Sequence, residues 1–230
     1  MMKKFVPCIY LHNEKAVAGF HDDTVISEQP VELAVWYNDN GADALIVFDL
    51  SDGDEAHEAS LDVIKEICSE TDVPVIGAGN VKRMEDIKKL LYAGCKRAAL
   101  NFSRPGNVDI LEEVSQKFGS DRIDICYTLQ DPVKENRENI LKYASELILI
   151  DADMAQEPLI TELPNILCMT DADEDTLAES LSGKAVSGVT GPAMNALSER
   201  ITELRRQCAK NGLEVTTLKP AFVWSDFKLN

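Results

Sequence analysis

The sequence has no apolar run long enough to cross a bilayer and no stretch that resembles an export signal. A membrane-spanning helix needs roughly 18 to 20 consecutive apolar residues, and no run here approaches that length. The N-terminus carries two lysines, but too few apolar residues follow them before His12 to form a secretory signal. These absences predict a cytoplasmic protein.

Positive charge is also scarce. The chain has 23 lysines and arginines against 40 aspartates and glutamates, which gives a formal net charge of −17. Such a field repels nucleic acid backbones and anionic lipid, so neither nucleic acid nor a membrane surface is an expected partner. A phosphorylated small molecule would need a local anion site made of backbone N–H groups and helix N-termini.

The patterns of histidine and cysteine that mark metal sites are missing. The three histidines fall in separate predicted loops, and the six cysteines lie far apart with no CxxC pair. The acidic run from Asp52 to Glu58 lacks the closing glutamate of a calcium loop. We therefore predict buried, reduced thiols, no metal and no cofactor.

What the chain does contain is a regular alternation of strand-like and helix-like segments. Most of the strand-like runs are continuously apolar, which is typical of parallel strands covered on both faces. The alternation predicts an α/β protein with a (β/α)8 barrel, and a doubly wound sheet with fewer units is the alternative. The expected strands are 4–10, 44–50, 73–78, 97–102, 123–129, 146–151, 165–169 and 184–189, and the expected helices are 30–40, 56–70, 83–93, 107–117, 132–144, 174–181 and 193–211.

The two halves of the chain resemble one another. "GADALIVFDL" matches "YASELILIDAD" in layout, which predicts a barrel built from two half-barrels. Gly212 is the expected C-terminal cap of the last helix. Residues 1–213 are therefore expected to form the barrel domain, and residues 214–230 to lead toward a domain downstream.

Open backbone and small polar side chains follow the third and fourth expected strands. Gly79 and Asn80 follow the third, and Asn101 and Ser103 follow the fourth. Ligands of such barrels bind where the strands end, and glycine permits close approach of an anion. We predict a phosphate site at these four residues, and a plain tight turn is the alternative.

A second group lies after the eighth strand. Gly188, Thr190 and Gly191 precede the last helix, which is the usual place of a phosphate site in a barrel. We predict that they bind phosphate, and a plain loop ending at Pro192 explains them as well.

Carboxylates also end two of the expected strands. Asp49 follows the second strand, and Asp151 and Asp153 follow the sixth. Structural capping explains each of them as well as catalysis does.

Several segments resemble a known family of histidine biosynthesis. The resemblance is to the cyclase subunit of imidazole glycerol phosphate synthase and to its sister, the phosphoribosylformimino isomerase. It implies a (β/α)8 barrel of two half-barrels that binds a substrate with two phosphates, with a weaker match in a degenerate second half. The segments are "FVPCIYL", "PVELAVWYNDNGADALIVFDLS", "VPVIGAGNVKRMEDIKKLLYAGCKRAALN" and "VSQKFGSDRIDI".

The resemblance fails at the two residues that carry the family's chemistry. The family places an aspartate at the end of strand one and another at the end of strand five, and the matching positions here hold Tyr10 and Thr128. Neither side chain can replace a carboxylate pair that shuttles protons near neutral pH. Asp49, Gly79 and Asn101 match the family, as does Ser103.

The sequence thus predicts a cyclase- or isomerase-like barrel without its acid–base pair, acting as a scaffold or as a domain that binds a phosphorylated metabolite. The alternative is an active cyclase or isomerase that uses displaced acids, for example Asp49 with Asp151 or Asp153. The end of the chain, "SDFKLN", resembles the entry to a phosphoribosyl-AMP cyclohydrolase domain, which predicts a fusion. A glutaminase subunit is a further partner that the resemblance implies.

Overall fold

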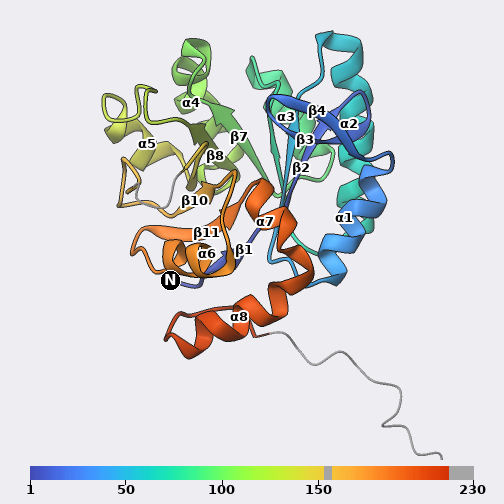
Figure 1. Ribbon diagram of the computed structural model, residues 1–230. Helices are drawn as coiled ribbons and strands as arrows, with labels where there is room; N and C mark the ends of the chain where they lie inside the picture. The colour runs from blue at the N-terminus through green and yellow to red at the C-terminus, as the bar shows by residue number, and fades with distance from the viewer. Residues whose placement is uncertain (153–156, 218–230) are drawn as a thin grey trace, which may run out of the picture.

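The computed structural model describes residues 1–152 and 157–217 as an α/β fold built on one curled sheet of 11 strands (Figure 1). Helices surround the sheet on its outer side. The strands are β1 (Lys4–Phe5), β2 (Cys8–His12), β3 (Lys15–Gly19), β4 (Asp22–Ser27), β5 (Leu45–Asp49), β6 (Val75–Ala78), β7 (Arg97–Asn101), β8 (Ile123–Tyr127), β9 (Glu146–Leu149), β10 (Asn165–Cys168) and β11 (Val186–Thr190). The α-helices are α1 (Pro30–Asp39), α2 (Gly53–Glu70), α3 (Met84–Tyr92), α4 (Pro105–Phe118), α5 (Arg137–Tyr143), α6 (Glu174–Leu181), α7 (Pro192–Ala196) and α8 (Ile201–Lys210).

The barrel is closed by its first strand, which is divided at Val6 and Pro7. β1 pairs in parallel with β11, with Phe5 opposite Val189, whereas β2 pairs in parallel with β5. Pro7 has no N–H to donate, but its carbonyl accepts a hydrogen bond from the Ile46 N–H at 3.2 Å. One short stretch of chain thus joins both edges of the parallel sheet, and the predicted (β/α)8 barrel is confirmed.

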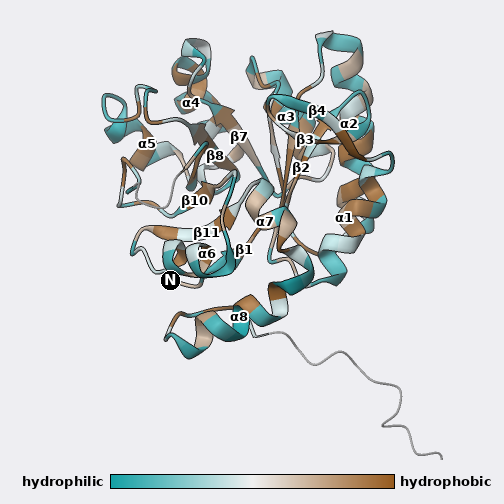
Figure 2. Cartoon of the chain, viewed as in Figure 1, coloured by the Kyte–Doolittle hydropathy of each residue, from teal (hydrophilic) through white to brown (hydrophobic). Residues whose placement is uncertain are grey.

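Side chains alternate between the inside of the barrel and the helices. The inner cluster includes Cys8, Tyr10, Ile46, Phe48 and Cys168, and the neighbouring positions on each strand pack against the helices instead. Both faces of the parallel strands are therefore largely buried, which explains why these strands are mostly apolar while the helices have one apolar and one polar side (Figure 2). Burying each large apolar side chain stabilises the fold by roughly 1.5 to 3 kcal/mol.

A hairpin at the mouth of the barrel was not predicted. β3 and β4 continue the sheet in antiparallel fashion beyond β2, and together with the division of the first strand they bring the expected eight strands to 11. The turn from β2 to β3 consists of Asn13 and Glu14, with φ of +50° and +60°, a left-handed pair that fits a two-residue hairpin. The sequence did not indicate this turn because glutamate, unlike glycine, is uncommon in the left-handed conformation.

Two expected helices are shorter than the sequence indicated. The segment 132–144 is helical only in α5, and the segment 193–211 is divided into α7, a 3-10 turn at Ser198–Arg200 and α8. The Ser198 hydroxyl donates to the Asn195 carbonyl at 2.5 Å, which takes that acceptor away from the helix. Gly212 has a φ of +83° just after α8, as expected for a helix end.

The bottom of the barrel, where the strands begin, holds a buried cluster of charges. The carboxylate of Glu146 lies 2.6 Å from Lys4 Nζ and 2.7 Å from Arg97, and it accepts a short hydrogen bond from Ser187. Arg97 Nε also lies 2.9 Å from Asp124, which is fully buried. Four charged side chains therefore neutralise one another inside the barrel.

Asp124 links the stability of the barrel to pH. Burial raises the pKa of Asp124 to about 7, because the loss of solvation outweighs the attraction of Arg97, and Glu146 repels it further. An acid with a raised pKa in the folded state contributes stability below about pH 4 that is lost as the pH rises through about 7. We expect Asp124→Asn to be more stable than the parent by about 2 to 4 kcal/mol at pH 8, with a smaller difference at pH 5, in urea denaturation. Identical pH dependence of both proteins would contradict this assignment.

Candidate functional site

The carboxyl ends of the parallel strands surround a cavity of about 290 Å³, which we call the mouth cavity. Its walls come from the loops after β6, β7, β8 and β9 and from the turn between β3 and β4. The lining residues are Phe20, His21, Phe48, Gly79, Asn101, Ser103, Cys126, Tyr127, Thr128, Ile150 and Asp151. The cavity thus occupies the place where barrels of this kind bind ligands.

Three residues of the first predicted phosphate site meet in this cavity. Gly79 has a φ of +77°, and a Cβ there would lie 2.2 Å from the Asp49 carbonyl oxygen, so only glycine fits. Asn101 Oδ1 accepts hydrogen bonds from the Ser103 N–H at 3.0 Å and from the Ser103 hydroxyl at 2.7 Å. Asn80 turns to the other side of the loop, where its amide donates to the Ser51 carbonyl at 2.7 Å.

The second predicted phosphate site is not part of the mouth cavity. Gly188 lies inside β11 opposite Lys4, and Thr190 at the end of β11 is fully buried. Gly191 has a φ of +95°, and a Cβ there would lie 2.5 Å from the Met169 carbonyl oxygen. Close packing of backbone, rather than an open loop, explains the glycine at that position.

Tyr10, where the resemblance places the family's first aspartate, is a buried aromatic ring. It stacks on Phe48 with ring centroids 5.3 Å apart and contacts Phe20 edge-on at 4.8 Å. The phenol oxygen lies 3.6 Å from Cys168 Sγ, and burial raises the pKa of Tyr10 far above its usual value. The ring therefore stays neutral and closes the centre of the barrel beneath the cavity.

Thr128, at the position of the second aspartate, does line the mouth cavity. Its N–H donates to the Asp131 carboxylate at 2.7 Å, which fixes the loop after β8. A threonine hydroxyl does not titrate near neutral pH, so this position offers hydrogen bonds but no proton transfer.

The candidate acids separate in the structure. Asp49 is buried outside the mouth cavity, where it accepts hydrogen bonds from the Ser51 N–H at 3.0 Å, the Ser51 hydroxyl at 2.5 Å and His57 Nδ1 at 2.5 Å. Asp151 lines the cavity with a φ of +53°, and Asp153 lies outside the described residues. Asp49 and Asp151 therefore do not face one another across the mouth.

The remaining side chains define what the cavity can do. Burial raises the pKa of the Cys126 and Cys168 thiols, so both stay neutral rather than nucleophilic. His21 at the rim was given no role by the sequence, because the hairpin that carries it was not foreseen. Within residues 1–152 and 157–217, no three side chains of metal-ligating type cluster together and no helix is both long and apolar enough to span a bilayer. The cavity offers neutral hydrogen-bonding groups, one carboxylate and one histidine.

Residues 4–126 match the family described as "Histidine biosynthesis protein". The chain belongs to this family. It is 32% identical over 119 residues to the imidazole glycerol phosphate synthase subunit HisF of Campylobacter concisus, over 51% of this chain and 47% of the relative. For the same subunit of Dictyoglomus turgidum the identity is 28% over 144 residues, covering 62% and 57%. The chain spans about half the length of these curated relatives.

The family match covers the part of the barrel that carries the candidate phosphate loop. It begins at Lys4 in β1 and ends at Cys126 in β8, so it includes Tyr10, Gly79 and Asn101. Asp151 and the loop after β11 lie beyond it. The resemblance in the sequence therefore identified the family and the half of the barrel that keeps its pattern.

Proposed function

We propose that this member of the histidine biosynthesis family binds a phosphorylated small molecule at its mouth cavity without catalysing the family's proton transfers. The observation that carries the proposal is Tyr10, a neutral ring stacked on Phe48 where the resemblance calls for a carboxylate. Gly79, Asn101 and Ser103 supply open backbone and small hydrogen-bonding groups around a cavity of about 290 Å³. These groups suit a phosphate, whereas proton transfer near neutral pH needs titratable partners.

The alternative, an active cyclase or isomerase with displaced acids, loses one of its named acids. The Asp49 carboxylate is occupied by Ser51 and His57, which leaves Asp151 as the acid that lines the cavity among the described residues. The pair of carboxylates that this alternative names is therefore not assembled in the cavity, whose described residues offer one carboxylate and the imidazole of His21. Formation of imidazole glycerol phosphate from its precursor nucleotide and ammonia, lost in Asp151→Asn, would favour this alternative.

Binding of ribose 5-phosphate tests the proposal directly. We expect titration calorimetry to show binding of ribose 5-phosphate. The affinity for ribose should be at least about tenfold lower, because the phosphate supplies the charge-assisted hydrogen bonds. The Ser103 hydroxyl donates to Asn101 Oδ1 in the free protein and would turn to the phosphate on binding, so Ser103→Ala should weaken binding of ribose 5-phosphate about threefold to tenfold.

Ser69→Ala is the matched control, because the Ser69 hydroxyl donates to the Glu66 carbonyl on the exposed side of α2. Equal affinity for ribose and ribose 5-phosphate would refute phosphate recognition at the mouth. An equal loss of affinity in both serine variants would refute the role of Ser103.

Partners follow from the relatives, which are named as subunits of a synthase. A scaffold role beside a second subunit, the glutaminase that the resemblance implies, belongs to the same proposal. The fusion with a cyclohydrolase domain stays a prediction, because "SDFKLN" lies outside the described residues. Reading the coding sequence beyond Asn230 tests it.

A further inference from the structure

A second, smaller cavity lies between α2 and α3, on the outer side of the loop that follows β6. Its volume is about 140 Å³, room for several water molecules or one small ion. It shares no lining residue with the mouth cavity, although Gly79 and Asn80 place the two cavities on opposite sides of one loop. The lining residues are Asp54, His57, Asn80, Lys82, Arg83 and Asp86.

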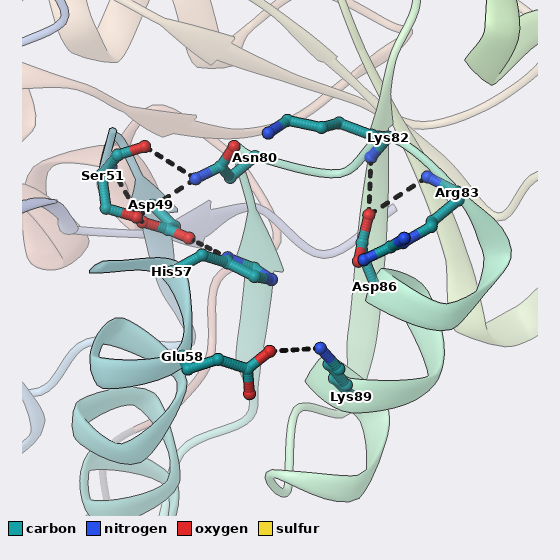
Figure 3. Close-up of polar contacts among 9 residues, drawn as sticks. All are labelled: Asp49, Ser51, His57, Glu58, Asn80, Lys82, Arg83, Asp86 and Lys89. Atoms are coloured by element: carbon teal, nitrogen blue, oxygen red, sulfur yellow. Dashed lines mark hydrogen bonds and ion pairs between the residues drawn. The ribbon is translucent and has the colours of Figure 1, made fainter. Parts of the chain in front are cut away.

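His57 is the unusual member of this group. Its side chain is 8% exposed, and its Nδ1 lies 2.5 Å from Asp49 Oδ2. The other ring nitrogen, Nε2, is buried and has no hydrogen-bond partner among the described residues. Figure 3 shows the ring extending from α2 with its far nitrogen directed toward α3. Buried polar atoms are almost always satisfied, so this nitrogen indicates a missing partner.

The carboxylates around His57 are already occupied. Asp86 accepts hydrogen bonds from the backbone N–H groups of Lys82 at 3.0 Å and Arg83 at 3.1 Å, and so caps α3. Asp49 is held by Ser51 as well as by His57. Asp54 is exposed, where water screens its charge.

The cationic groups, in contrast, are largely available. The Lys82 ammonium has no ion-pair partner among the described residues, and Arg83 reaches Asp86 only through Nε, at 3.4 Å. The guanidinium of Arg83 keeps its two terminal nitrogens for another acceptor. Figure 3 places both side chains at the edge of the gap that His57 faces.

We infer that this cavity binds a small oxyanion, the phosphate group, with His57 Nε2 as its buried hydrogen-bond partner and Lys82 and Arg83 as its cationic rim. His57 already uses Nδ1 toward Asp49, so Nε2 is the ring nitrogen left to bond the anion, for example by accepting the O–H of a hydrogen phosphate. The inference is independent of the phosphate proposed for the mouth cavity.

The three histidines of the chain allow a test in which each site has its own reporter. In a sample with 15N-labelled histidine rings, inorganic phosphate is added while the ring nitrogens of His12, His21 and His57 are followed, with histidine-to-glutamine variants for assignment. We expect the His57 Nε2 resonance to shift saturably as phosphate fills the cavity. His21 reports the mouth cavity separately, and His12, with Nδ1 3.0 Å from Asp23, serves as the reference.

Two lysine variants test whether the phosphate response of His57 comes from binding in this cavity. Lys82→Met should weaken the phosphate response of His57 about fivefold to tenfold, the effect of losing one charge-assisted bond. Lys89→Met is the matched control, because Lys89 pairs with Glu58 across the same two helices (Figure 3) without lining the cavity.

Two outcomes would overturn the inference. One is a His57 resonance unchanged up to about 100 mM phosphate, two decades above a dissociation constant of about 1 mM. The other is an equal loss of response in both lysine variants. A shift of His21 alone would support the mouth cavity and reject this site. A parallel titration with ribose 5-phosphate distinguishes the two possible ligands of the cavity. If ribose 5-phosphate binds more tightly than inorganic phosphate, the ligand is a phosphate monoester. If it binds more weakly, the ligand is the free ion.

Discussion

Replacing Tyr10 with aspartate will destabilise the barrel by roughly 4 to 7 kcal/mol instead of restoring the family's chemistry. The substitution removes a fully buried ring that stacks on Phe48 at 5.3 Å and contacts Phe20 at 4.8 Å. It also places a carboxylate in an apolar layer beside Cys168. Thermal and urea denaturation measure the loss directly.

Tyr10→Phe is the control, because it keeps the ring and removes only the hydroxyl near Cys168. We expect it to cost no more than about 1 kcal/mol. The double variant with Tyr10→Asp and Thr128→Asp should be still less stable and should form no imidazole glycerol phosphate. A folded double variant with substantial turnover would show that two carboxylates were all that the barrel lacked.

Replacing Glu146 with glutamine should cost roughly 3 to 5 kcal/mol, the effect of removing one partner from a buried ion pair. Glu146 is 2% exposed and is bonded to Lys4, Arg97 and Ser187 at the bottom of the barrel. Glutamine keeps the volume but leaves two cations facing one acidic group, Asp124. Urea denaturation at pH 7 provides the measurement.

Glu162→Gln is the matched control for this prediction. Glu162 pairs with Arg137 at the surface, with each side chain 46% exposed, so its loss should change stability by less than about 1 kcal/mol. Equal losses of unfolding free energy in both variants would show that the buried cluster stabilises the barrel no more than a surface ion pair does.

The sequence was sufficient for the barrel because its strands are buried on both faces. Continuous apolar runs such as residues 44–48 are typical of strands buried on both faces, and their spacing around amphipathic helices indicates parallel order. The turn at Gly79 could also be predicted from the Gly-Ala-Gly-Asn run, although the Asp49 carbonyl that requires glycine there is visible only in the structure. These features depend on local patterns that any single chain displays.

Other features depend on tertiary contacts that no local pattern encodes. Asp49 ends a strand, as expected of a catalytic acid. Side chains alternate between the two faces of β5, however, and Asp49 falls on the outer face, where it contacts His57, eight residues later in the chain. Phe20 becomes part of the mouth only because the hairpin of β3 and β4 folds over Tyr10. The division between α7 and α8 likewise depends on Asn195, whose side chain bonds both the N–H and the carbonyl of Cys8.

The division of the first strand at Pro7 also determines the order in which this protein can fold. β2 and β5 are separated in the chain by β3, β4 and α1, and their pairing brings Cys8 to Ile46, which closes a far shorter loop than the pairing of β1 with β11. β1 pairs with β11, which lies far along the chain, so Phe5 can pair with Val189 only after β11 is available. Distant pairings carry the larger entropic cost and form late. On the ribosome, the open sheet from β2 onward would therefore assemble first, and its two edges would join only after the last strand has emerged.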